Sequence, residues 1–107
     1  MFGYKTEDYS KPADMINAIK KVKNLGDYIF TISTKRTPDG GGDDKFWYQD
    51  LDIAGNHAYM LKPKKVNGKI YVDLINPWHS DSVSCTLTLE QLDSLGCFSF
   101  LAMVKVK

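Results

Sequence analysis

The residues of this chain that are best suited to chemistry are a histidine, an asparagine and a tryptophan on either side of one turn. His57 opens the segment HAYML, and the segment VDLINPW contains Asn76 and ends at Trp78. An amide oxygen that accepts the Nδ1 proton of a histidine fixes the ring tautomer and leaves Nε2 as a base. A tryptophan across that hydrogen bond would exclude water and strengthen it. The three residue types together indicate a general base with its orienting group.

A hairpin between these segments decides whether the two side chains meet. Asn67-Gly68 separates two apolar runs, which is the strongest short-range hairpin signal. A two-residue turn places Tyr59 opposite Asn76, so His57 and Asn76 become diagonal neighbours on one face, with Cα atoms about 7–8 Å apart. A three-residue loop would put the two side chains on opposite faces. We therefore expect an even-length turn.

The face that carries His57 also has an apolar row that a core would bury. The row consists of Tyr59, Leu61, Ile70, Val72 and Leu74. An imidazole, an amide and an indole at the end of such a row are unusual if packing is their only purpose. A structural alternative stays open, in which His57 is a hydrogen-bonded histidine at a sheet edge and Asn76 forms an Asx-type turn before Pro77.

Other elements must support this hairpin. The segment SKPADMINAIKKVKNLG predicts a helix with Ser10 as N-cap and Gly26 as C-cap. The segments DYIFTIST, KFWYQ and FSFLAMVKV predict strands. The segment CTLTLEQLDSLGC predicts a short helix that Thr88 and Gln91 begin as a capping box and Gly96 ends. The apolar stripe of the first helix consists of Met15, Ile16, Ile19 and Val22.

Composition indicates one soluble domain that spans residues 1–107. Apolar residues make up 43% and charged residues 25%, and the net charge is only +1. We expect no nucleic-acid partner and no membrane association, and we interpret the lysines as solvated faces. No signal peptide is recognisable, and two cysteines suggest a reduced, cytoplasmic protein. The lysine clusters are Lys20, Lys21 and Lys23, then Lys62, Lys64 and Lys65.

Metal binding has little support in the sequence. Asp39, Asp43 and Asp44 lie in a glycine-rich loop, but their spacing does not match a known calcium loop. No Cys-x-x-Cys or Cys/His spacing suggests zinc. We expect neither a metal nor another cofactor.

The two blocks GNHAYML and LINPWH, with a lysine-rich hairpin between them, resemble the histidine and asparagine blocks of calpain-type cysteine peptidases. That family has a Gly-His-Ala-Tyr segment and an Asn-Pro-Trp-Gly segment in the same order. The resemblance covers Leu51 to Trp78. It implies an α+β fold, the β-rich half of a papain-like fold, with an antiparallel sheet or partial barrel, an N-terminal helix and a short C-terminal helix. It also implies that His57 is the general base, Asn76 its orienter and Trp78 the shield.

The chain departs from the family in three ways. No cysteine precedes His57, so the nucleophile would come from a segment that this sequence does not contain. His79 stands where the family has glycine. The family's calcium loop is not recognisable after the asparagine block. The resemblance therefore implies the C-terminal subdomain of a calpain-like cysteine endopeptidase, with a protein or peptide substrate and a Cys-bearing half in cis or in trans.

Three other functions stay open. Cys85 or Cys97 could replace the nucleophile in a rearranged order, and His57 with His79 could form an acid–base pair for nuclease chemistry. The chain could also be a non-catalytic protein-binding module on a degenerate peptidase scaffold, with Phe46, Trp47 and Tyr48 as its surface. An isolated half-domain would expose the face that normally packs on its partner, so we expect self-association.

Overall fold

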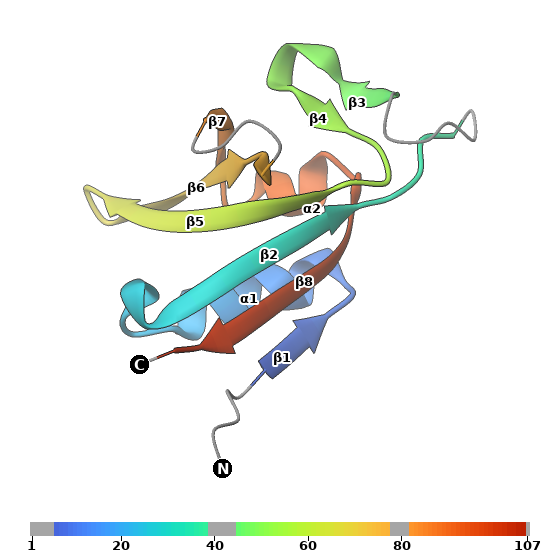
Figure 1. Cartoon of the computed structure of the whole chain (residues 1–107). Coiled ribbons are helices and arrows are strands. Elements are labelled where there is room, and N and C mark those ends of the chain that lie inside the picture. Colours follow the sequence, from blue (N-terminus) through green and yellow to red (C-terminus); the bar gives the residue numbers. More distant parts are fainter. Residues whose placement is uncertain (1–5, 39–44, 78–81, 107) are drawn as a thin grey trace.

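The computed structural model describes residues 6–38, 45–77 and 82–106. Its largest element is a six-stranded antiparallel sheet with the strand order β1-β8-β2-β5-β6-β7 (Figure 1). The edges β1 and β7 are not paired with each other, so the sheet is open. Its strands are β1 Thr6–Tyr9, β2 Tyr28–Thr34, β5 Ala58–Val66, β6 Lys69–Ile75, β7 Val83–Thr88 and β8 Phe98–Lys105.

A small two-stranded ribbon lies beyond the ends of β2 and β5 (Figure 1). It pairs β3, Phe46–Tyr48, with β4, Ile53–Ala54, and the 3-10 helix η2, Gln49–Leu51, connects them. The prediction of a strand within KFWYQ is confirmed. The ribbon immediately precedes His57, so it determines how the chain enters β5.

Both α-helices cover the same face of the large sheet (Figure 1). They are α1, Pro12–Lys21, and α2, Gln91–Ser94, and they contact each other. Of the expected apolar stripe, Met15 and Ile19 of α1 are fully buried, Ile16 is partly buried against the core, and Val22 packs there from just beyond the end of the helix. The fold is therefore α+β with a mostly antiparallel sheet and two helices, one layer of helices on one layer of strands.

The predicted caps of α1 are wrong. Lys11, not Ser10, occupies the N-cap position, and its side chain makes no capping hydrogen bond. The helix ends at Lys21, where the extended backbone of Val22 stops it. Gly26 lies instead in the 3-10 helix η1, Leu25–Asp27, and donates its N–H to the Asn24 side chain.

The helix-covered face holds the core because strand side chains alternate between the two faces. Phe30 and Ile32 of β2 and Tyr59 and Leu61 of β5 are at most 1% exposed. Val72 and Leu74 of β6 are fully buried on the same face, which confirms most of the predicted row, and Ile70 is half-buried. On the opposite face several apolar side chains stay in solvent, among them Ile29, Met60 and Phe100.

The β5–β6 hairpin has the predicted register. Val66 pairs with Lys69, and the pairing continues without a shift to Met60 opposite Ile75. Asn67 and Gly68 have φ angles of 52° and 81°, the left-handed values that a two-residue type I′ turn requires. His57 and Asn76 therefore flank the last pair of the ladder at its open end.

The C-terminal part confirms the final strand and corrects the second helix. Helix α2 begins at Gln91, and its N-cap is Glu90, two residues after the expected N-cap Thr88. Only the reciprocal half of the expected capping box forms, since the Gln91 side chain accepts the Thr88 backbone N–H at 2.8 Å. Gly96, with φ of 71°, ends the helix as predicted. Strands β1 and β7 were not predicted.

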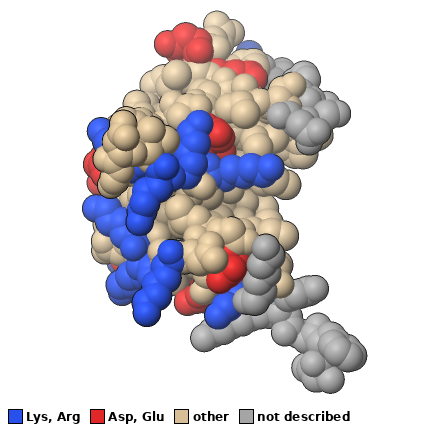
Figure 2. Space-filling model, turned by 90° about the vertical axis from the view of Figure 1, so that its left-hand side faces the viewer, with Lys and Arg blue, Asp and Glu red and all other residues tan. Residues whose placement is uncertain are grey.

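Lysine side chains gather over the hairpin and the end of α1 (Figure 2). The six clustered lysines are all exposed, as the interpretation as solvated faces requires. One of them, Lys64, forms an ion pair with Asp73 across the hairpin at 3.3 Å. Within the described ranges, no helix has the length and apolar character needed to span a bilayer.

Candidate functional site

His57 and Asn76 meet at the open end of the β5–β6 hairpin. The Nε2 atom of His57 lies 3.1 Å from the Oδ1 atom of Asn76. An amide oxygen only accepts, so this hydrogen bond requires the imidazole proton on Nε2. The expectation that Nδ1 would meet the amide is therefore wrong. In the neutral ring it is Nδ1 that carries the basic lone pair.

The two side chains of this pair differ in their exposure to solvent. Asn76 is buried, with 7% of its surface exposed, whereas His57 is half-buried. The His57 and Tyr59 rings form a T-shaped contact with centroids 4.8 Å apart. A buried acceptor and a packed aromatic neighbour restrict the imidazole to a narrow range of orientations.

The backbone before His57 turns sharply and has little room. Asn56 has φ of 50°, a left-handed value that asparagine tolerates better than most residues other than glycine. At Gly55 an added Cβ would lie 2.7 Å from the Cγ2 atom of Thr37. The segment Ala54–His57 therefore fits closely against the residues that follow β2.

Two buried hydroxyl groups contact this segment. Thr34, the last residue of β2, is 4% exposed, and its Oγ1 accepts the backbone N–H of His57 at 2.9 Å. The hydroxyl of Tyr59 accepts the backbone N–H of Ala54 at 2.8 Å. Burial raises the pKa of Tyr59, so its hydroxyl keeps its proton well above neutral pH. The sequence interpretation missed both roles.

A signal for Thr34 does exist in the sequence. It continues the buried positions Phe30 and Ile32 of β2 at a spacing of two. A hydroxyl in such a row must find buried partners, because burying an unpaired polar group is costly. For the Tyr59 hydroxyl no comparable signal exists, because its partners lie in a ribbon whose course the sequence does not reveal.

Several predicted site residues lie outside the described ranges. These are Trp78, the expected shield, and His79, the expected partner in an acid–base pair. The three aspartates of the glycine-rich loop, Asp39, Asp43 and Asp44, lie outside them as well. Pro77 is described and is exposed directly after Asn76.

Neither cysteine has the properties of an activated nucleophile. Cys97 is fully buried, and burial raises its pKa to about 11. Burial also raises the pKa of Cys85 to about 11, and nearby Asp52 adds to the shift. Reactive cysteines have a lowered pKa, because the thiolate is the nucleophile. Both thiols are free, with no disulfide between them.

The three aromatics of β3 do not form a common exposed surface. Phe46 is 40% exposed, but Trp47 and Tyr48 pack against the core. The Trp47 indole donates to the Lys35 carbonyl at 2.8 Å, and the Tyr48 hydroxyl donates to the Leu95 carbonyl at 2.8 Å. Two of the three rings therefore stabilise the ribbon.

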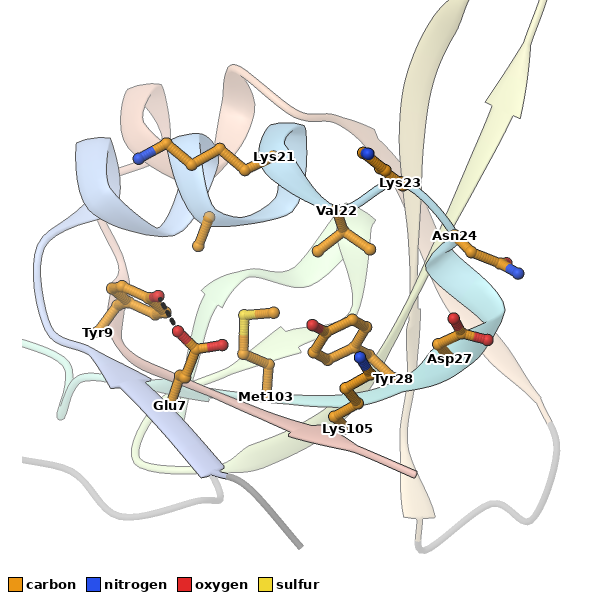
Figure 3. Close-up of a pocket in the computed structure, with 11 residues that line it drawn as sticks. Glu7, Tyr9, Lys21, Val22, Lys23, Asn24, Asp27, Tyr28, Met103 and Lys105 are labelled. Atoms are coloured by element: carbon orange, nitrogen blue, oxygen red, sulfur yellow. Dashed lines mark hydrogen bonds between the residues drawn. The ribbon is translucent and has the colours of Figure 1, made fainter. Parts of the chain in front are cut away.

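One pocket of the structure is remote from His57 and Asn76. It has a volume of about 450 Å³ and lies between the end of α1 and strands β1, β8 and β2 (Figure 3). Tyr28, the first residue of β2, lines it, whereas Thr34, the last residue of β2, holds the backbone of His57.

In the described part of the chain, no group of three or more His, Cys, Asp or Glu side chains could hold a metal ion.

Comparison of this chain with protein-family models, with curated protein sequences and with solved structures finds no match.

Proposed function

We propose that this chain is the His/Asn-bearing, β-rich half of a calpain-like, papain-fold cysteine endopeptidase. The observation that supports it is the hydrogen bond of 3.1 Å between Nε2 of His57 and Oδ1 of Asn76. Cysteine–histidine–asparagine hydrolases need such a pair, in which an amide fixes the tautomer of the base. The order of the two blocks around the hairpin supports the same class.

In this proposal His57 acts as base and then as acid through Nδ1. Asn76 holds the proton on Nε2, so Nδ1 can take the thiol proton of a cysteine supplied by the other half. The thiolate attacks the peptide carbonyl, and His57 passes the proton to the leaving amine. His57 then takes a proton from the water that cleaves the thioester, and the proton returns to the thiolate. Burial of Asn76 strengthens its hydrogen bond to the ring.

The cysteine must come from a segment outside this sequence. A pKa of about 11 leaves Cys85 and Cys97 almost entirely as thiols at neutral pH. The proposed partner is the Cys-bearing half, in cis or in trans, and the proposed substrate is a protein or peptide. The proposal uses no metal and no other cofactor, and it assigns the protein to the reducing cytoplasm, where free thiols persist.

Reconstitution tests the proposal. The chain is fused to, or mixed with, the helical Cys-bearing half of a calpain-type peptidase, and cleavage of a fluorogenic peptide is measured. We expect activity that neither half has alone. His57→Ala should then reduce it on the order of 10² to 10⁴-fold, because the base is lost. Asn17→Ala, a change on the exposed side of α1, should have no effect. Full activity of the reconstituted His57→Ala protein would contradict the proposal.

A second candidate is a non-catalytic protein-binding module on the same scaffold. The two unactivated thiols favour it, because neither Cys85 nor Cys97 has the lowered pKa of a cysteine nucleophile. Phe46 is the one β3 aromatic that is well exposed. A partner of this kind should bind the His57→Ala and Asn76→Ala proteins normally and should lose affinity for Phe46→Ala. Titration of a purified partner by calorimetry distinguishes the two candidates.

A further inference from the structure

Ala54 is held from both sides by hydroxyl groups of two different strands. The Thr34 hydroxyl, from β2, donates to the Ala54 carbonyl at 2.7 Å. The Tyr59 hydroxyl, from β5, accepts the Ala54 N–H at 2.8 Å and donates to the Asp52 carbonyl at 3.1 Å. One peptide segment is thus fixed through its donor and its acceptor by two buried side chains.

Thr34 also holds the backbone of the histidine itself. Its hydroxyl accepts the His57 N–H at 2.9 Å, and its own backbone N–H donates to the His57 carbonyl at 2.8 Å. The Thr34 Oγ1 atom lies 2.7 Å from the Ala54 carbonyl oxygen and 3.2 Å from the His57 carbonyl oxygen, so the Ala54 carbonyl is the closer acceptor. The single Thr34 side chain therefore fixes the distance between Ala54 and His57.

The backbone between these two points needs such support. Asp52 and Asn56 both have left-handed φ angles, 54° and 50°, which cost energy in residues other than glycine. An unsupported chain would relax toward ordinary extended backbone. That relaxation would rotate the His57 side chain away from Asn76, because the direction of a side chain follows the backbone that carries it.

We propose that Thr34 and Tyr59 are positioning residues that orient the His57 imidazole toward Asn76. The catalytic consequence rests on the proposed function, whereas the coupling between the two hydroxyls and the imidazole is a property of this chain alone. The hydroxyl groups of both residues bond to backbone atoms of the segment that leads to His57. Both act through the backbone of Ala54 and His57, and Tyr59 also acts through its ring contact with the imidazole.

Nitrogen-15 NMR of the His57 ring in the chain alone tests the coupling. Thr34→Val keeps the shape and removes the hydroxyl, and Tyr59→Phe removes the second hydroxyl while keeping the ring contact. In both variants we expect the tautomer with the proton on Nε2 to lose its dominance. Thr34→Ser, which restores the hydroxyl, should recover the wild-type spectrum. The matched controls are Thr31→Val and Tyr71→Phe, which make the same changes at residues outside the site. Both should leave the ring signals of His57 unchanged.

The outcomes separate this inference from the proposed function. If Thr34→Val does not fold, Tyr59→Phe decides by the same measurement. Folded variants that both keep the wild-type ring tautomer would overturn the inference, whatever the reconstituted protein does. In an active reconstituted enzyme, the loss in kcat/KM should reach about 10²-fold for Thr34→Val, the cost of a misplacement of about 1 Å. A reconstituted enzyme without activity would contradict the proposed function and leave the NMR result to decide this inference.

Discussion

His57 Nε2 lies 3.1 Å from Asn76 Oδ1, although 19 residues separate the two in the sequence. The turn at Asn67 and Gly68 produces this proximity, because its even length keeps both side chains on the helix-covered face of the sheet. The orientation of the imidazole has a second source, the segment Asp52–His57 held by β2 and β5. The hairpin brings His57 and Asn76 close together, and the segment before His57 orients the imidazole toward Asn76.

The turn gives the first prediction. Gly68→Ala should destabilise the protein by about 1–2 kcal/mol, because alanine is strained at the φ of 81° that Gly68 has. Space is not limiting, since an added Cβ meets nothing within 4 Å. Urea unfolding measures the effect. Gly26→Ala, where the added Cβ makes only an ordinary contact with Asn24, is the matched control. Equal midpoints for both variants would show that the turn is not strained as described.

Gly55 tests the tight packing of the segment before His57. Gly55→Ala would bring a Cβ to 2.7 Å from Thr37 Cγ2 and to 3.2 Å from the Thr37 N atom. We expect a loss of about 1–3 kcal/mol in the free energy of unfolding, the usual cost of overpacking. Thr37→Ser removes Cγ2 and keeps the hydroxyl, so the double variant should recover part of the loss. No recovery would mean that the contact with Thr37 is not the cause.

The buried thiols predict a pH dependence of stability. In the folded chain the pKa of Cys97 is about 11, above its ordinary value of 9.0. The neutral thiol is therefore favoured by folding, and this stability is complete below pH 9 and is lost as the pH rises toward 11. Cys97→Ala should be less stable at neutral pH, yet its free energy of unfolding should fall less steeply from pH 9 upward. Parallel pH profiles for the two proteins would contradict this.

The face of the sheet without helices predicts self-association. Ile29, Met60 and Phe100 are 48%, 40% and 39% exposed on this face. They lie on three adjacent strands, and a partner that covers this face would bury them. We expect concentration-dependent association by sedimentation and its loss in Met60→Lys/Phe100→Lys. Asn17→Lys, on the exposed side of α1, is the control. A monomer at high concentration would exclude this prediction.

Elements with strong local signals could be predicted from the sequence. The Asn67-Gly68 hairpin, the strand Tyr28–Thr34 and the helix with Met15 and Ile19 follow from turn chemistry and from apolar periods of two and of 3.6 residues. The short edge strand β1 could not, because Thr6–Tyr9 has little apolar pattern and its pairing with β8 is determined by tertiary structure.

The sequence predicts that His57 and Asn76 lie close together. It does not predict which nitrogen of the imidazole forms the hydrogen bond. Residue spacing and turn length bring His57 and Asn76 together. Which ring nitrogen meets the amide depends on the backbone that enters β5, which Asn56 turns with a left-handed φ of 50°. The backbone there is held by Thr34, which lies 23 positions before His57 and accepts its N–H. Such non-local hydrogen bonds leave no periodic pattern in a sequence.

The protonation state of the His57 ring is the most direct test of the central claim. Nitrogen-15 NMR at a pH where the imidazole is neutral should find the proton on Nε2, slow to exchange and hydrogen-bonded to the Asn76 side chain. Asn76→Ala should then shift the ring toward a mixture of both tautomers, whereas Asn17→Ala should not. A ring with its proton on Nδ1 in the wild-type protein, unchanged by Asn76→Ala, would contradict the claim.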